Sequence, residues 1–414
     1  MDPTVRGRAT PWAPAALVLT ATLLAAGCSG QPGAGPEPTA TESSAAPHGY
    51  VEGAREAAEE QSRLLLGDPD TGASRVLDLV TGEVQQTAPV PDATRLTTDG
   101  RFGFYHTARD ARVVDGGSWT VDHGDHVHYY RAAIRDVGAL PADHGAEIRS
   151  DAAVTAVTGR DGRTGLYDRT ELEQGGIRPL RTLGGTHAGA VVPYAEHLVA
   201  LTGDDDSAQV TVYDREGGRV ATPDATCVRP RGDAVTRRGV VLGCADGALL
   251  VRAENGTFTA DRIPYGRDVP EKERAAAFRH RAGSDTLTAP AGERAVWVLD
   301  VTDRTWTRVD TGPVLAANTA GEGALLLVLE SDGALHGYDI ATGRHASRTK
   351  TLLTGAGEGP TDASGPAVEV DRSRAYVNDR AGRRVYEIDY NDDLRVARSF
   401  DLDIEPGLMA ETGR

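Results

Sequence analysis

Short runs of apolar residues, separated by polar turns, cover most of the chain after the first fifty residues. Many of these runs alternate apolar and polar positions, as strands with one buried face do, and they end at turn dipeptides such as Asp-Gly and Thr-Gly. Residues 51–66 are the one stretch with the length and pattern of an amphipathic helix. The pattern therefore predicts an all-β fold.

One element recurs along the chain: a strand that ends in an acidic or polar residue and is followed by a turn. Eight copies end at Asp78, Asp115, Asp168, Asp214, Arg252, Asp300, Asp339 and Asp389. Their mean spacing is about 44 residues, and a period of about 40–50 residues with four short strands per unit is typical of a β-propeller. We therefore predict a single β-propeller with eight blades. Seven blades are the alternative if the copy at Arg252 is not a true repeat.

The two ends of the repeat region complement each other. The first unit, residues 62–90, has room for only three strands, and a remnant at residues 404–412 follows the last full unit. We expect this remnant to pair as the inner strand of the first blade and to close the ring, because closure removes exposed sheet edges.

The N-terminal residues have the pattern of an export signal. Arg6 and Arg8 precede an apolar run at residues 12–26, which ends in Leu-Ala-Ala-Gly-Cys at residues 24–28 and resembles a bacterial lipoprotein signal. We predict a signal peptide over residues 1–27, lipidation of Cys28, a flexible tether over residues 28–50 and the propeller over residues 51–414. The protein is then exported and lipid-anchored to the outer face of the bacterial cytoplasmic membrane. An ordinary secretory signal with an incidental cysteine is the alternative.

Charge and cysteine content narrow the choice of partners. The formal net charge is −17, so the chain repels nucleic acid and we predict no nucleic-acid partner. Cys227 and Cys244 are the two cysteines beyond Cys28, and outside the cytoplasm such a pair predicts a disulfide. A thiolate metal site is the rival interpretation.

The candidate chemistry is concentrated in the string His-Gly-Asp-His-Val-His-Tyr-Tyr at residues 123–130. Imidazole and carboxylate are common zinc ligands, and on an extended strand His126 and His128 point the same way. We predict a zinc site formed by His123, Asp125, His126 and His128, with His187 as a further candidate ligand. A solvated histidine patch on an outer strand is the alternative.

The other histidines and the remaining motifs give weaker evidence of function. Five histidines stand singly in the sequence and predict surface or core positions: His106, His144, His197, His336 and His345. We find no nucleophile elbow, no cysteine nucleophile with a base and no phosphate-binding loop. The chain is therefore not expected to be an enzyme, and a hydrolase or lyase with a channel metal is the minority alternative.

The repeat, taken with the string at residues 123–130, resembles the AztD-type zinc metallochaperones. These are exported propeller proteins that hand zinc to the solute-binding protein of a zinc ABC importer. His187-Ala-Gly and the unit flanked by Cys227 and Cys244 match further elements of that family. The resemblance implies zinc as the bound metal and an importer's solute-binding protein as the partner.

Two positions depart from the family pattern. Arg231-Gly-Asp233 stands where the family has His-Gly-Glu, and Ala146 stands where the third unit tends to carry a histidine. If those positions bind metal in the family, this chain has lost part of a site. A propeller that keeps the scaffold for metal-free protein interaction is the alternative function.

Overall fold

The computed structural model of the chain describes residues 50–122, 126–204, 206–355 and 365–414. Within these ranges the chain forms 35 strands, one short α-helix, α1 (Arg169–Glu173), and one 3-10 turn, Glu271–Glu273. The all-β prediction is confirmed. Residues 51–66, the one candidate for a helix, instead contain β1 (Arg55–Ala57) and the start of β2 (Arg63–Gly67), and all of β2 is buried in a sheet.

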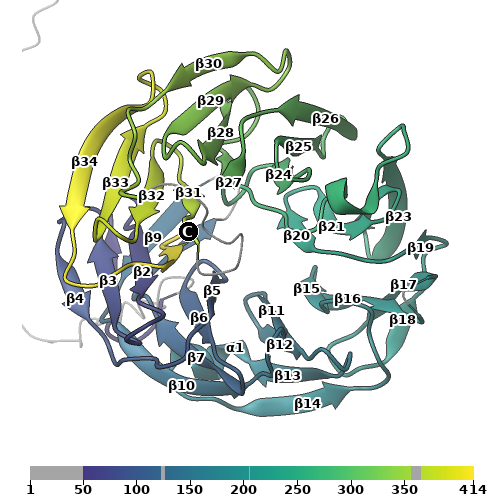
Figure 1. Cartoon of the computed structure of the whole chain (residues 1–414). Helices are drawn as coiled ribbons and strands as arrows, with labels where there is room; N and C mark the ends of the chain where they lie inside the picture. Colours follow the sequence, from purple (N-terminus) through teal and green to yellow (C-terminus); the bar gives the residue numbers. More distant parts are fainter. Residues whose placement is uncertain (1–49, 123–125, 205, 356–364) are drawn as a thin grey trace, which may run out of the picture. The chain divides into compact units, whose positions relative to one another are not determined.

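The strands form nine antiparallel sheets in the described residues, and eight of these follow one another along the chain (Figure 1). The first four comprise β35 (Leu408–Thr412), β2, β3 (Ser74–Asp78) and β4 (Val84–Gln86); β5 (Arg95–Thr98), β6 (Phe102–His106), β7 (Asp110–Asp115) and β10 (Arg135–Pro141); β11 (Glu147–Ser150), β12 (Val154–Thr158), β13 (Thr164–Asp168) and β14 (Pro179–Leu183); and β15 (Val192–Tyr194), β16 (His197–Thr202), β17 (Ala208–Tyr213) and β18 (Arg219–Ala221).

The next four sheets repeat this order. They comprise β20 (Asp233–Thr236), β21 (Gly239–Cys244), β22 (Gly247–Glu254) and β23 (Thr257–Pro264); β24 (Thr286–Pro290), β25 (Ala295–Asp300) and β26 (Thr305–Asp310); β27 (Val314–Thr319), β28 (Leu325–Glu330), β29 (Leu335–Asp339) and β30 (His345–Arg348); and β31 (Val368–Val370), β32 (Ala375–Asp379), β33 (Arg384–Asp389) and β34 (Arg395–Asp401).

Each of the eight recurring elements falls in a different one of these sheets, in the strand next to the outermost one. The acidic end residue has a local structural reason. The side chain of Asp78 accepts hydrogen bonds from the amides of Val80 and Thr81, and Asp339 accepts one from the amide of Thr342. An aspartate that bonds to backbone two or three residues ahead stabilises a tight turn. At these positions the repeated aspartate therefore belongs to the turn that follows the strand.

The hydrophobic core lies between neighbouring sheets. Val199 and Val212 of the fourth sheet pack with Leu242 and Val251 of the fifth, and similar clusters join the other neighbours. The first strands of neighbouring sheets also contact one another, as β11 does β15 and β27 does β31. The sheets are thus stacked side by side with their first strands toward a common centre, which is a propeller-like arrangement (Figure 1).

The C-terminal strand completes the first sheet. β35 pairs with β2 in antiparallel register from Arg63↔Thr412 to Gly67↔Leu408, and every residue of both strands is buried. The expected pairing of the remnant at residues 404–412 with the first unit is confirmed.

The disulfide is confirmed between Cys227 and Cys244, whose Cα atoms are 5.3 Å apart. Cys227 lies in β19 (Thr226–Cys227), which pairs with β17 of the fourth sheet, whereas Cys244 ends β21 of the fifth. The bond therefore ties two neighbouring sheets together rather than two strands of one hairpin.

The ninth sheet is an insertion. β8 (Ser118–Asp122) and β9 (Val127–Arg131) form a hairpin between β7 and β10, and β1 pairs along the free side of β9. β10 returns to pair with β7, so the second sheet is complete without the strands of this hairpin. In the described ranges, no helix combines the length and the hydrophobicity needed to cross a membrane.

Candidate metal centre

The inserted hairpin is anchored at its base by aromatic and polar contacts. Trp119 and Tyr130, opposite each other in the register, stack with ring centroids 5.4 Å apart. The guanidinium of Arg101 lies 3.7 Å from the centroid of Trp119, a cation–π geometry. The hydroxyl of Thr120 donates to the carbonyl of Gly413, 2.6 Å away. These contacts hold the hairpin against the C-terminal end of the chain.

Two predicted ligands lie together where the turn of this hairpin meets β9. The rings of His126 and His128 are 4.9 Å apart between centroids and nearly perpendicular, at 80°. Nδ1 of His128 is 2.6 Å from Oε1 of Glu56 in β1. A hydrogen bond from Nδ1–H to this carboxylate leaves Nε2 as the ring nitrogen that could bind a metal. The strand β1 thus places an orienting carboxylate beside a histidine in β9.

His123 and Asp125 lie outside the described residues, so their part in the site stays a prediction.

His187 occupies a different setting, beside the third and fourth sheets. Its Nδ1 lies 3.0 Å from the carbonyl oxygen of Gly162 and 3.1 Å from the hydroxyl of Thr164, and its ring meets Tyr213 edge-on. Burial lowers the pKa of His187, against a smaller raising effect of the bond to Gly162. Among the described residues its buried Nε2 has no hydrogen-bond partner. Its contacts are those of a core histidine, and its role as a ligand stays a prediction.

Arginine side chains contact the positions at which this chain departs from the pattern of the resembled family. The carboxylate of Asp233 accepts two hydrogen bonds from Arg149, at 2.5 and 2.9 Å. Burial acts to lower the pKa of Arg149, but the carboxylate of Asp233 raises it by more, so Arg149 stays charged. Arg231 pairs with Glu271 at 3.0 Å. Ala146 is fully buried, and its carbonyl accepts a bond from Arg95. Guanidinium groups thus lie around both positions, and they repel a metal ion.

Two histidines that stand singly in the sequence meet in the structure. β29 and β30 bring Nδ1 of His336 to 3.0 Å from Nε2 of His345, although the two are nine residues apart in the sequence. His336 is buried and His345 exposed, which are the kinds of position predicted for single histidines. Across the described ranges, the single group of three or more metal-ligating side chains with donor atoms within 4.8 Å is Glu330, Asp332 and His336. The sequence signal that could have indicated this group is the short spacing of Glu330, Asp332 and His336, around the turn between β28 and β29.

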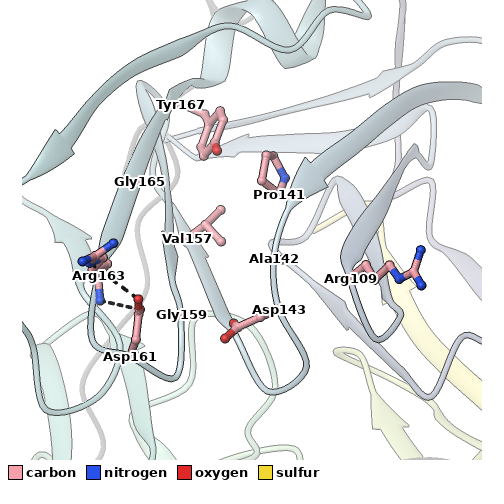
Figure 2. Close-up of a pocket in the computed structure, with 10 residues that line it drawn as sticks. All are labelled: Arg109, Pro141, Ala142, Asp143, Val157, Gly159, Asp161, Arg163, Gly165 and Tyr167. Carbon is pink, nitrogen blue, oxygen red and sulfur yellow. Dashed lines mark hydrogen bonds and ion pairs between the residues drawn. The ribbon is translucent and has the colours of Figure 1, made fainter.

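A shallow pocket opens elsewhere, between the second and third sheets (Figure 2). It is lined by Arg109, Pro141, Ala142, Asp143, Val157, Gly159, Asp161, Arg163, Gly165 and Tyr167. Asp161 and Arg163 pair with each other across its rim. None of the predicted ligands lines this pocket, so it is separate from the hairpin and from the His336 group.

The fold and the inserted hairpin define a class: an all-β, propeller-like protein that carries paired histidines on an insertion after the third strand of its second sheet. No family model matches the sequence. The fold is of the AztD type. The chain is similar to the crystal structure of AztD from Citrobacter koseri, with a TM-score of 0.70 and 17% identity over 86% of this chain and 98% of that one. The apo form of the same protein gives a TM-score of 0.68 at 16% identity.

A more distant likeness is to the dihydro-heme d1 dehydrogenase NirN, with a TM-score of 0.53 and 13% identity over 87% of this chain and 77% of that one. At these identities the comparisons establish the fold, and the chemistry must be argued from the residues of this chain.

Proposed function

We propose that this chain is an exported, lipid-anchored zinc metallochaperone that binds zinc at the β8–β9 hairpin and delivers it to the solute-binding protein of a zinc ABC importer. The observation that carries the proposal is the pair His126 and His128, with Glu56 placed to orient one of them. The AztD-type fold and the string at residues 123–130 support it. The function is binding and transfer rather than catalysis.

The hairpin suits a cargo that must leave again. His126 is exposed and His128 is partly exposed, so incoming ligands of a partner can reach a metal held between them. His123 and Asp125 would add an imidazole and a carboxylate, a set without thiolates. Oxygen and nitrogen sites of this kind exchange zinc more readily than closed thiolate sites.

The proposal includes a ring of eight blades. Eight sheets follow one another along the chain, and β35 joins the last part of the chain to the first sheet. Pairing of this kind, which unites the two ends of the repeat, leaves a propeller with only short outer edges.

Zinc titration of the protein, prepared without a histidine tag, tests the binding step. We expect the variant His126→Ala/His128→Ala to bind one equivalent of zinc fewer than the wild type. The matched control is His144→Ala/His197→Ala, which removes two histidines outside the hairpin and should leave the stoichiometry unchanged. Equal stoichiometry and affinity in the hairpin variant and the wild type would sink the proposal in favour of the metal-free interaction scaffold.

Transfer is tested separately with the zinc-loaded protein and the apo solute-binding protein of a zinc ABC importer. The reference is the rate at which a chelator in excess captures zinc from the loaded protein alone. Delivery through a complex predicts faster zinc arrival at the solute-binding protein than this release rate allows. Arrival at the release rate contradicts directed delivery but leaves zinc binding intact.

A further inference from the structure

We propose a second metal site, formed by Glu330, Asp332 and His336 and supported by His345, which takes a divalent transition-metal ion such as zinc. It lies where β28 turns into β29, with β30 alongside. It shares no residue with the hairpin site, and it does not depend on the function proposed above.

The donor atoms have the spacing of one coordination shell. Nε2 of His336 is 3.1 and 3.2 Å from the two carboxylate oxygens of Asp332, and 3.7 Å from Oε2 of Glu330. Tetrahedral zinc binds nitrogen and oxygen at about 2.0–2.2 Å, which places neighbouring ligand atoms about 3.4 Å apart. A metal ion can therefore enter among these three side chains with little movement of any of them.

Glu330 is held so that one oxygen is turned to the site. Its Oε1 accepts hydrogen bonds from the hydroxyl of Tyr338 and, at 3.0 Å, from the amide of Gly312. A Cβ at position 312 would lie 1.8 Å from Oε2, so only glycine allows the carboxylate this place. Its orientation is thus fixed by Tyr338 of β29 and by Gly312 in the connection between β26 and β27.

His345 supplies the partner that a metal-binding imidazole needs. Nδ1 of His336 and Nε2 of His345 are 3.0 Å apart, so one of them donates to the other. Without a metal ion, Nε2–H of His336 can donate to Asp332 while Nδ1 accepts from His345. When His336 donates from Nδ1 instead, the lone pair of Nε2 is left for a metal ion. Histidine ligands commonly bind metal with one nitrogen while the other donates to a fixed acceptor.

The charges around the site favour a cation with a route to solvent. Oδ1 of Asp332 accepts a hydrogen bond from the amide of Ala334, 2.9 Å away, and both carboxylate oxygens lie close to Nε2 of His336. The Asp332 side chain is 46% exposed, whereas Glu330 and His336 are buried. Arg348 lies 3.8 Å from Asp332 and is itself 63% exposed, so it can turn toward solvent when an ion enters. Mixed imidazole and carboxylate ligands suit zinc and its neighbours.

Zinc titration in two backgrounds tests the site. In the variant His126→Ala/His128→Ala we expect one equivalent of bound zinc to remain, and adding His336→Gln should remove it. In the otherwise wild-type protein His336→Gln alone should also remove one equivalent, whatever the hairpin does. Asp332→Asn, at the exposed ligand, should weaken this equivalent at least 10-fold without disturbing the buried residues.

Cobalt(II) gives an independent readout, because its visible absorption reports an ordered coordination site. We expect a band in the hairpin variant that disappears with His336→Gln, while the matched substitution His197→Gln preserves it. Far-UV circular dichroism of each variant checks the fold. If zinc stoichiometry is the same with and without His336→Gln and Asp332→Asn in both backgrounds, the site does not exist.

Discussion

A buried carboxyl group in the C-terminal strand should make the stability of this protein fall as the pH rises. Glu411 in β35 is fully buried, and among the described atoms neither of its carboxylate oxygens has a hydrogen-bond partner. Burial raises its pKa from an ordinary value near 4.5 to about 8, and the carboxylates of Asp371 and Glu369 add to the effect. Arg414, 3.7 Å away, opposes it. We expect Glu411 to be protonated in the folded protein at neutral pH.

The sign and size follow from linkage between protonation and folding. The pKa of Glu411 is higher in the folded protein than in the unfolded chain. Its contribution to the free energy of unfolding is therefore fully present below pH 4.5 and is lost as the pH rises through 8. Integration between pH 5 and pH 8 gives a loss of about 3 kcal/mol in the free energy of unfolding. Glu411→Gln keeps the shape of the side chain and removes the titration. The difference in the free energy of unfolding between this variant and the wild type should therefore shift by about 3 kcal/mol in favour of the variant from pH 5 to pH 8.

Urea unfolding of both proteins at pH 5, 6, 7 and 8 measures this difference. Glu83→Gln, at an exposed turn before β4, removes one negative charge elsewhere and serves as the control. If Glu411→Gln were less stable than the wild type at pH 8, Glu411 would be an ionised partner of Arg414 and the reasoning would be refuted.

Three further outcomes are expected. Glu56→Leu should weaken zinc binding at the hairpin about 10-fold, measured by titration against a chromophoric chelator, because it removes the acceptor that orients a ligand; unchanged affinity would dismiss that role. Replacing Cys227 and Cys244 by alanine should lower the free energy of unfolding in urea by about 3 kcal/mol, given their separation of 17 residues, and equal midpoints would contradict this. Asp115→Asn should cost about 3–5 kcal/mol by the same assay, because it removes the carboxylate closest to the buried guanidinium of Arg101 and leaves the longer contact to Glu173; a loss under 1 kcal/mol would show that the remaining contacts replace the pair.

The repeat was readable from the sequence because it records local structure. Each unit needs the same turn after the same strand, and an aspartate such as Asp78 or Asp339 makes that turn with its own side chain. The pairing of β35 with β2 was also predictable, because a unit short of one strand and a remnant at the other end of the chain complement each other.

The surroundings of the sites were not predictable in the same way. Glu56 meets His128 only because β1 adds to the inserted hairpin, a contact across 72 residues. His336 meets His345 through the pairing of β29 with β30, which includes a register shift. A shift of one residue in a strand turns a side chain to the opposite face, so sequence spacing alone does not decide such contacts. The ion pairs of Arg149 with Asp233 and of Arg231 with Glu271 were also not predictable from sequence spacing, because the partners come from distant segments of the chain.

The pairing of β2 with β35 has a consequence for biosynthesis. The partner of Arg63 is Thr412, so the first sheet cannot be completed until nearly the whole chain has been made. A ribosome adding about 5–20 residues per second needs tens of seconds for the intervening stretch. Throughout that time the edge of β2 is open to wrong partners, including the edges of other nascent chains. The other seven sheets of the repeat are built from strands that lie close together along the chain, so the completion of the first sheet is the step that must come last.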